Sequence, residues 1–496
     1  MANCIMGLDI GPSGCKAVVF DTAGRERASA RREYALEFPK DGWMELNAET
    51  VAKAAFDCVK HCALSCGTIE ALAVSSQGEA IIPVDAEGKP LLNAVVTFDN
   101  RCAEETAWLT SEFGRDFISD ITGAPIHTMF SLPKILWIKN KVPDIYKKTW
   151  KFLCFGDFIS MRLGAAPVID FSMASRTLAF DIRKKTWSEP ILNRCGIPLE
   201  KMPETAVPGT AIGTITAQTA SLTGLRPGTK IIAGGHDQVC CALGSGVLTG
   251  GTAMDSLGTT ESILCVGKTP RTTQAMREKN IPCYCYTVNG LYAYLTFLSS
   301  SGAILKWFTE DICRNTDMTE MDKEAEVLPT GSMGLSVLPH FAGSGTPYLD
   351  FDSKGIIAGL SLGTTRQQIY RAILEATCFE SRLNIENMEK SGIEVHELIC
   401  VGGGAKSDFW LQMKADITEK PVVRSLAAEA GCFGAAILAG IGAGIYRSAG
   451  DAFSAAKGNE RRFFPDEKRR KLYNEVYRKY EKLYGLSLEY RKDLLT

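Results

Sequence analysis

The stretch GLDIGPSGCKAVVFD, residues 7–21, decides the fold. An apolar run leads into a turn of Gly, Pro and Ser, and a second apolar run follows. Two such runs around a short Gly-containing turn are typical of a β-hairpin. Rossmann and Walker phosphate loops lead from a strand into a helix, so the stretch predicts neither of them.

A second stretch of the same kind, GTAMDSLGTTESILCVG, begins at residue 251. Its turn spans residues 256–260, and the repetition suggests a duplication. Strand-like runs at residues 69–76 and 397–404 alternate with helical stretches such as residues 48–66, which is an α/β pattern. The Pro-, Gly- and Thr-rich residues 203–230 read as turns with short strands.

Length and composition favour a multidomain protein with a small-molecule partner. A chain of 496 residues with 45% hydrophobic content exceeds one core, and we expect lobes of residues 1–245 and 246–496 with a hinge near residue 245. Lys and Arg number 55 against 57 Asp and Glu, so no basic excess indicates nucleic acid or a membrane surface. The 17 cysteines form no framework, and MANCIMG has no signal-peptide character, so we expect a cytoplasmic protein.

Three sequence features resemble functional patterns but are better explained by packing. Cysteines at four-residue steps, Cys58, Cys62 and Cys66, and the alternating Cys283 and Cys285 are interpreted as buried apolar residues rather than metal ligands. Residues 427–446 approach one bilayer span but consist mostly of small residues, so an internal helix is expected. A helical stripe of Tyr473, Tyr477, Tyr480 and Tyr484 is expected to pack on its own domain.

The two hairpin turns are candidate phosphate-binding sites. Glycine lets a phosphate approach the backbone, while amides and hydroxyls donate to its oxygens. Asp9 precedes the first turn and would repel a phosphate unless Mg²⁺ lies between them, which favours a metal-bound nucleotide. Ordinary hairpin turns are the alternative.

A candidate general base lies in GGHDQVCCALGSG. Asp237 follows an apolar run at a point where a strand would end and a helix begin, and ligands bind at such strand ends. Its carboxylate could accept the proton of an attacking hydroxyl. The residue could equally be a helix N-cap, and the local sequence leaves both interpretations open.

Other polar and glycine-rich segments follow strand-like runs. Gln77, Glu79, Asp99 and Arg101 could hydrogen-bond a polyhydroxylated ligand, or they could be exposed loop residues. The three glycines at residues 402–404 could let a nucleoside lie against bare backbone.

Together these motifs resemble the FGGY carbohydrate kinases of the actin, hexokinase and Hsp70 superfamily. The resemblance extends, in order along the chain, to VIDFSMASRTLAFDIRKKTW, FAGSGTPYLDFDSKGIIAGLS and GGGAKSDFWLQMKADI. The resemblance implies two ribonuclease-H-like lobes with ATP and Mg²⁺ in the cleft between them. It implies transfer of the γ-phosphoryl group to a sugar or polyol hydroxyl, with closure of the lobes on sugar binding. Homodimers are common in the family.

The resemblance also implies residue roles. Asp237 matches the catalytic base. Asp9 matches the carboxylate that binds Mg²⁺, and Asp237 is also expected at the metal. The first phosphate turn is matched by Gly11 and Ser13, the second by Gly258, Thr259 and Thr260, and the adenosine loop by Gly402, Gly403 and Gly404. Sugar-binding positions are matched by Gln77, Gly78, Glu79, Asp99, Arg101, Asp237 and Gln238.

Pro12 departs from the family, which usually has Thr or Ser at that turn position. Proline lacks both the amide hydrogen and the hydroxyl, leaving Ser13 and Lys16 as donors. We expect weakened ATP binding rather than lost catalysis.

The acceptor motif is mixed. D-xylulose kinases of the family typically read Gln-Met-His where this chain reads Gln77-Gly78-Glu79, and glycerol kinases read Gln-Arg-Glu; Gln238 also resembles the latter. Gly78 is expected to leave extra room, and Thr97 stands where many members have Trp. A ketopentose such as D-xylulose is expected, with glycerol, erythritol, ribulose and a non-catalytic sugar sensor as alternatives. The sugar-kinase motifs leave little chain for the peptide-binding domain or polymer surface of an Hsp70-like or actin-like ATPase.

Overall fold

The computed structural model describes residues 3–425, 427, 429–456 and 460–494. Residues 1–2, 428, 495 and 496, which belong to stretches discussed above, lie outside the described residues.

The first hairpin forms the centre of a sheet, as predicted. Strands β1 and β2 pair antiparallel with Asp9 opposite Lys16, and β5 and β14 extend the sheet in parallel from β1. The order is β13-β14-β5-β1-β2-β3. The strands are β1 (Cys4–Ile10), β2 (Gly14–Asp21), β3 (Glu26–Glu33), β5 (Ile69–Ser76), β13 (Ala211–Thr214) and β14 (Lys230–His236).

The second hairpin forms the centre of another sheet with the same pairing pattern. Strand β15 pairs antiparallel with β16 and parallel with β21, which is followed by the parallel β22. The order is β17-β18-β16-β15-β21-β22-β23. The strands are β15 (Gly251–Leu257), β16 (Glu261–Gly267), β17 (Cys283–Cys285), β18 (Tyr292–Leu298), β21 (Val395–Val401), β22 (Val422–Arg424) and β23 (Arg461–Phe463). Both predicted hairpins and the α/β fold are confirmed.

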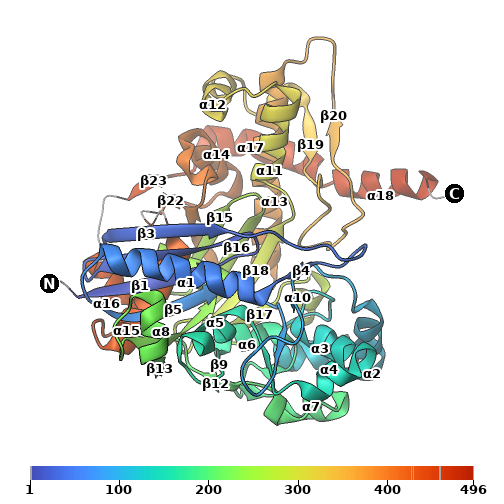
Figure 1. Cartoon of the computed structure of the whole chain (residues 1–496). Coiled ribbons are helices and arrows are strands. Elements are labelled where there is room, and N and C mark those ends of the chain that lie inside the picture. The colour runs from blue at the N-terminus through green and yellow to red at the C-terminus, as the bar shows by residue number, and fades with distance from the viewer. Residues whose placement is uncertain (1–2, 426, 428, 457–459, 495–496) are drawn as a thin grey trace.

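Helices surround the two sheets (Figure 1). In the first half these are α1 (Ala48–Ser65), α2 (Ala103–Thr122), α3 (Ser131–Lys141), α4 (Pro143–Lys148), α5 (Phe155–Leu163), α6 (Phe171–Ala174), α7 (Glu189–Cys195), α8 (Ala217–Thr223) and α9 (Asp237–Ser245). In the second half they are α10 (Gln274–Glu278), α11 (Gly302–Trp307), α12 (Met318–Glu326), α13 (Arg366–Lys390), α14 (Asp408–Thr418), α15 (Ala430–Ala443), α16 (Ala449–Ala455), α17 (Glu467–Tyr480) and α18 (Leu483–Leu494).

Short strands form additional two-stranded ladders. They pair β4 (Glu45–Leu46) with β7 (Ala94–Val95), β6 (Ile82–Val84) with β8 (Lys151–Leu153), β9 (Val168–Asp170) with β12 (Glu204–Ala206), β10 (Phe180–Asp181) with β11 (Thr186–Trp187), and β19 (Ser336–Leu338) with β20 (Ile356–Ala358).

Helix α15 joins the two halves. It contacts α9 and the strands β1, β5 and β14, so a helix from late in the chain covers the first sheet (Figure 1). Glycine makes this approach possible: a Cβ on Gly434 would lie 1.9 Å from the carbonyl oxygen of Cys240, and one on Gly7 would lie 1.8 Å from that of Cys432. The internal helix predicted within residues 427–446 is therefore confirmed. A search of the described part of the chain finds no helix with the length and apolarity to cross a membrane.

The lobe division at residue 245 stays a prediction. The two main sheets take their strands from opposite sides of that residue, whereas α15 crosses to the first sheet.

The other packing interpretations are confirmed with two exceptions. Cys66 is half-buried and follows the end of α1, and Tyr484 lies on α18 rather than on the helix of the other three tyrosines, where it stacks on Tyr348. Cys58 and Cys62 are buried on α1, and both cysteines of β17 are buried. The tyrosines of α17 are buried, and their rings pack against Phe379 of α13.

Candidate active site

Three neighbouring parallel strands bring predicted site segments to one sheet edge. Strands β1, β5 and β14 end at Ile10, Ser76 and His236 and are aligned by the register Ile10–Ser76–His236. The loops that follow begin with Gly11, Gln77 and Asp237. Because the carboxyl ends of parallel strands form the usual ligand-binding edge of an α/β sheet, this edge is a candidate acceptor and metal site.

Asp237 is the first residue of α9, and His236 rather than Asp237 occupies the N-cap position. The Asp237 carboxylate accepts a hydrogen bond of 2.6 Å from the Gln238 amide, and its side chain is 31% exposed. The N-cap alternative is therefore wrong, which leaves the carboxylate available to a ligand. Burial, and then the charge of Asp9, raises the pKa of Asp237 to about 8.

His236 was not singled out in the sequence. Its Nε2 lies 3.3 Å from Oδ1 of Asp237. Burial, and then the positive charge of Arg176, lowers the pKa of His236 to about 3, so the imidazole is neutral. The neutral imidazole therefore contacts the carboxylate of the candidate base without forming an ion pair with it.

Asp9 and Asp237 are the predicted metal ligands, and this role stays a prediction. Asp9 accepts a hydrogen bond of 2.7 Å from Oγ of Ser75, and burial raises its pKa. The charge of Asp9 also raises the pKa of Asp237, so an ionised Asp9 disfavours the ionisation of Asp237. Within the described residues no group of three or more His, Cys, Asp and Glu side chains could hold a metal.

The first turn is held by its neighbours. The amide of Gly11 donates to the carbonyl of Gly14 at 2.9 Å, and the carbonyl of Gly11 accepts hydrogen bonds from Tyr34 Oη at 2.7 Å and Gln77 Nε2 at 3.2 Å. Gln77, a predicted sugar ligand, thus ties the acceptor loop to the turn. Pro12 and Ser13 are exposed at the tip.

Lys16, a predicted phosphate donor, forms an ion pair with Glu429 in this structure. Its Nζ lies 2.5 Å from Oε1 of Glu429. Contact with a phosphate would require Lys16 to leave or share this carboxylate.

Glu79 is buried in a cationic setting. Its Oε1 accepts from Nε of Arg176 at 2.5 Å, and its carbonyl accepts from Nζ of Lys134 at 3.0 Å. Oε2 accepts from the hydroxyl of Thr97 at 3.0 Å. Burial raises the pKa of Glu79, but Arg176 and the other positive groups more than offset it, so the pKa is lowered. Arg176 lies in the VIDFSMASRTLAF motif, and only the tertiary pairing reveals this contact.

The room expected beside Gly78 is already filled. A Cβ on Gly78 would lie 2.7 Å from Nε2 and Cδ2 of the His236 imidazole. The expectation that Gly78 enlarges the acceptor site is therefore wrong at this point, because the missing side chain makes space for His236.

Asp99 and Arg101 form a closed cluster. Oδ1 of Asp99 accepts from Nε of Arg101 at 2.9 Å, and Nη2 of Arg101 lies 2.8 Å from Oε1 of Glu45. The guanidinium lies over the ring of Trp43, 3.8 Å from its centroid. The Arg101 side chain is 3% exposed, and the Asp99 side chain is fully buried. A direct role in sugar binding stays a prediction for both residues.

Four of the predicted nucleotide-binding residues line a pocket of about 1070 Å³ in the second half of the chain. It brings Gly258 and Thr259 of the second turn together with Gly403 and Gly404. Gly402 lies behind this wall with a φ of 88°, and a Cβ there would lie 2.7 Å from the carbonyl oxygen of Leu257. Neither Gly402 nor Thr260 lines the pocket itself.

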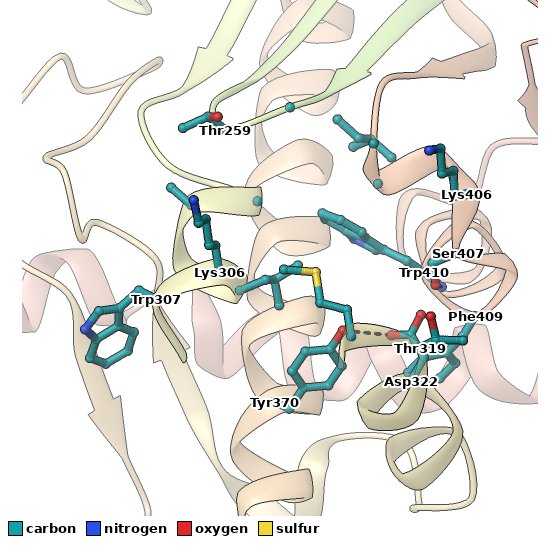
Figure 2. A pocket seen from close by; sticks show the side chains of 18 of the residues that line it. Thr259, Lys306, Trp307, Thr319, Asp322, Tyr370, Lys406, Ser407, Phe409 and Trp410 are labelled. Carbon is teal, nitrogen blue, oxygen red and sulfur yellow. Dashed lines mark hydrogen bonds between the residues drawn. The ribbon is translucent and has the colours of Figure 1, made fainter. Parts of the chain in front are cut away.

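Sequence reasoning missed most of the pocket walls. They include Lys306, Trp307, Asp322, Tyr370, Phe409 and Trp410, from four helices and the loops beside them. The hydroxyl of Tyr370 donates to Oδ1 of Asp322 at 2.8 Å (Figure 2). Aromatic walls beside a glycine-rich turn are suited to a ligand with a flat ring at one end and phosphates at the other. The only signal in the sequence was the short distance of Phe409 and Trp410 from the three glycines.

Profile comparisons assign the chain to a family. The profile of the FGGY family of carbohydrate kinases, N-terminal domain, matches residues 4–244, and the C-terminal domain profile of the same family matches residues 253–443. The chain belongs to the FGGY family of carbohydrate kinases. It has the actin- and hexokinase-like ATPase fold and is a sugar kinase, a phosphotransferase.

Individual relatives span the whole chain. The xylulose kinase of Bacillus subtilis strain 168 is 29% identical over 99% of this chain and 98% of its own length. The glycerol kinase of Thermococcus gammatolerans is 31% identical over 96% of each chain. The crystal structure of a gluconate kinase from Lactobacillus acidophilus has a TM-score of 0.92 at 24% identity, covering 99% of this chain and all of its own, and shows the shared fold.

Proposed function

We propose that this protein transfers the γ-phosphoryl group of Mg-ATP to a terminal hydroxyl of a ketopentose, with D-xylulose as the first candidate. The observation that carries the proposal is the carboxylate of Asp237, which lies at the start of α9 beside the loops after β1 and β5. A base at that edge is available to an acceptor hydroxyl, while the pocket of the second half is suited to a nucleotide.

In this mechanism Asp237 accepts the proton of the acceptor hydroxyl as that oxygen attacks the γ-phosphorus. With a pKa of about 8 the group is mostly protonated at pH 7 in the free protein, so the carboxylate that accepts the proton would be favoured by Mg²⁺ bound beside it. Amides of the two turns and the hydroxyls of Ser13 and Thr259 hold the phosphates in line and stabilise their charge. Asp9 and Asp237 would hold Mg²⁺, which neutralises charge on the phosphates when it is bound.

Two observations support the choice of acceptor. The half-buried carboxylate of Asp237 is available to a sugar hydroxyl, and a relative over 99% of the chain is named xylulose kinase. Glycerol is the second candidate, since a relative of similar extent is named glycerol kinase and Glu79 follows the glycerol kinase pattern. A homodimer remains a prediction.

The test is coupled ADP release from wild-type protein and from Asp237→Asn, with Mg-ATP and a panel of D-xylulose, D-ribulose, L-ketoses, erythritol, glycerol and gluconate. We expect D-xylulose to raise wild-type turnover far above the rate with ATP alone. Asp237→Asn, which keeps the shape but not the base, should lose about 10²-fold or more.

Two results would contradict the proposal. If only another acceptor supports turnover, the protein is a kinase of that acceptor and D-xylulose is not its substrate. Absence of both acceptor-dependent turnover and ATP binding in calorimetry would favour the non-catalytic sensor.

A further inference from the structure

A fully buried ionic cluster lies directly behind the second phosphate turn. Nζ of Lys414, on α14, lies 2.7 Å from Oδ2 of Asp255 and 2.6 Å from Oε1 of Glu261. The side chains of all three residues are fully buried. Asp255 belongs to β15 and Glu261 begins β16, so the two carboxylates bracket the turn of residues 258–260.

Hydrogen bonds connect this cluster to the turn itself. The hydroxyl of Ser301 donates to Oε2 of Glu261 at 2.8 Å, and the amide of Ser301 donates to the carbonyl of Thr259 at 3.0 Å. The next two amides continue the pattern: Gly302 donates to Gly258 at 3.0 Å, and Ala303 donates to Thr259 at 3.1 Å. The carbonyl oxygens of Gly258 and Thr259 are therefore held by the backbone amides of residues 301–303.

The cluster also connects the turn to the pocket walls. Lys414 donates to the hydroxyl of Ser381 on α13 at 2.9 Å, and that hydroxyl in turn donates to Glu261. Helix α14 carries Trp410, one helical turn before Lys414, and Trp410 lines the pocket. Lys414, Asp255 and Glu261 themselves do not line it.

Stability alone does not account for such a cluster. Removing three charges from water is costly, and well-packed apolar residues of similar volume often stabilise a fold as well or better. Here one lysine faces two carboxylates, and Oδ1 of Asp255 has no hydrogen-bond partner. What the cluster provides is a fixed geometry for the hairpin ends relative to α13 and α14.

We propose that Lys414, Asp255 and Glu261 are positioning residues that hold the second turn in the conformation that binds the nucleotide phosphates. The inference rests on the proposed function, because it takes the turn as a phosphate site. The cluster acts on the phosphates through the backbone and contacts no ligand. Its loss should therefore weaken phosphate binding selectively and leave nucleoside binding intact.

The test is calorimetric binding of Mg-ATP and of adenosine to the full chain. In Glu261→Gln, which keeps the shape of the side chain and removes its charge, Mg-ATP affinity should fall about tenfold while adenosine affinity stays within twofold of wild type. Ser301→Ala removes one link from the turn to the cluster and should weaken Mg-ATP binding by a smaller factor with the same selectivity. If Glu261→Gln does not fold, Ser301→Ala alone tests the inference.

Asp416→Asn is the matched control. Asp416 lies on the same helix, its side chain is 1% exposed, and its Oδ2 is 2.6 Å from Nε of Arg469, outside the pocket. This variant should leave both affinities unchanged. Equal loss of Mg-ATP and adenosine binding in the cluster variants, or no loss of either, would overturn the inference. Wild-type protein that binds neither ligand would instead refute the proposed function.

Discussion

Pro12 and Gly78 are the two residues at which this chain departs most clearly from the family patterns, and the structure separates their effects. Pro12 is exposed at the tip of the first turn, where it faces no packing constraint from a buried neighbour. Gly78 is buried, and the imidazole of His236 occupies the space next to its Cα. One departure lies in a turn that is predicted to contact a ligand, and the other affects packing against His236, next to the candidate base.

Replacing Pro12 with Thr should strengthen ATP binding. The substitution restores an amide and a hydroxyl, and one additional hydrogen bond contributes about 1 kcal/mol, which lowers the Kd of Mg-ATP about fivefold. Calorimetric titration measures the change. Pro12→Ala, which restores the amide alone, is the control that separates the two donors. Unchanged affinity in Pro12→Thr would show that this turn position does not contact the phosphates.

Replacing Gly78 with Ala should destabilise the protein through His236. The new methyl group would lie 2.7 Å from two ring atoms of the imidazole, and relief of such overlap typically costs about 1–3 kcal/mol. Urea denaturation measures the free energy of unfolding. In a His236→Ala background the same substitution should cost much less, because the overlapping ring is gone. An equal cost in both backgrounds would contradict the steric explanation.

At the scale of single elements, the sequence predicted the two hairpins well because their signal is local. Alternating apolar runs around a Gly-containing turn need no distant partner to form. Helix α8 was missed within residues 203–230, where the Pro, Gly and Thr content favoured turns. Thr216 caps this helix through a reciprocal bond with Thr219, and Gly224 ends it in the left-handed conformation. The sequence contains these cap residues, but the Pro-, Gly- and Thr-rich composition around them favoured a prediction of turns.

The close contact between α15 and α9 gives a prediction at this scale. Gly434→Ala should lower the free energy of unfolding by about 2 kcal/mol or more, because the Cβ would lie 1.9 Å from the carbonyl oxygen of Cys240 and the helices must separate. Denaturant titration measures this. Gly485→Ala on the exposed face of α18, where a Cβ meets nothing within 4 Å, should instead stabilise by about 0.5–1 kcal/mol. Similar effects of both substitutions would contradict the packing argument.

At the scale of the whole molecule, the candidate site is divided between the two halves. Asp9, the first turn and Asp237 lie at one edge of the first sheet, whereas the candidate nucleotide pocket is lined by residues of the second half. Helices α9 and α15 pack where the halves meet. Transfer of a phosphoryl group requires these parts to come together around the metal and the acceptor.

Binding of magnesium nucleotide should release a proton from Asp237. Without metal its pKa of about 8 leaves the carboxyl mostly protonated at pH 7, and a bound divalent cation favours the carboxylate and lowers that pKa. We therefore expect release of nearly one proton at pH 7 and progressively less above pH 8, where the group is already ionised. Calorimetry with magnesium-saturated ADP, in two buffers of different ionisation enthalpy, measures the number of protons.

Asp237→Asn is the control for this measurement and should release no proton at this site. Equal proton counts in wild-type and variant protein would assign the proton to another group.

The sequence by itself determined the α/β class, both hairpins, the burial of Cys58, Cys62 and the three tyrosines of α17, and Asp9 and Asp237 as candidate carboxylates, because each depends on local periodicity or on a motif. Only the tertiary structure decided which side chains meet: His236 beside Gly78, Arg176 against Glu79, and Lys414 between Asp255 and Glu261. These contacts join residues far apart in the chain, and what places them is the packing of complete sheets and helices, for which a single sequence carries no local signal.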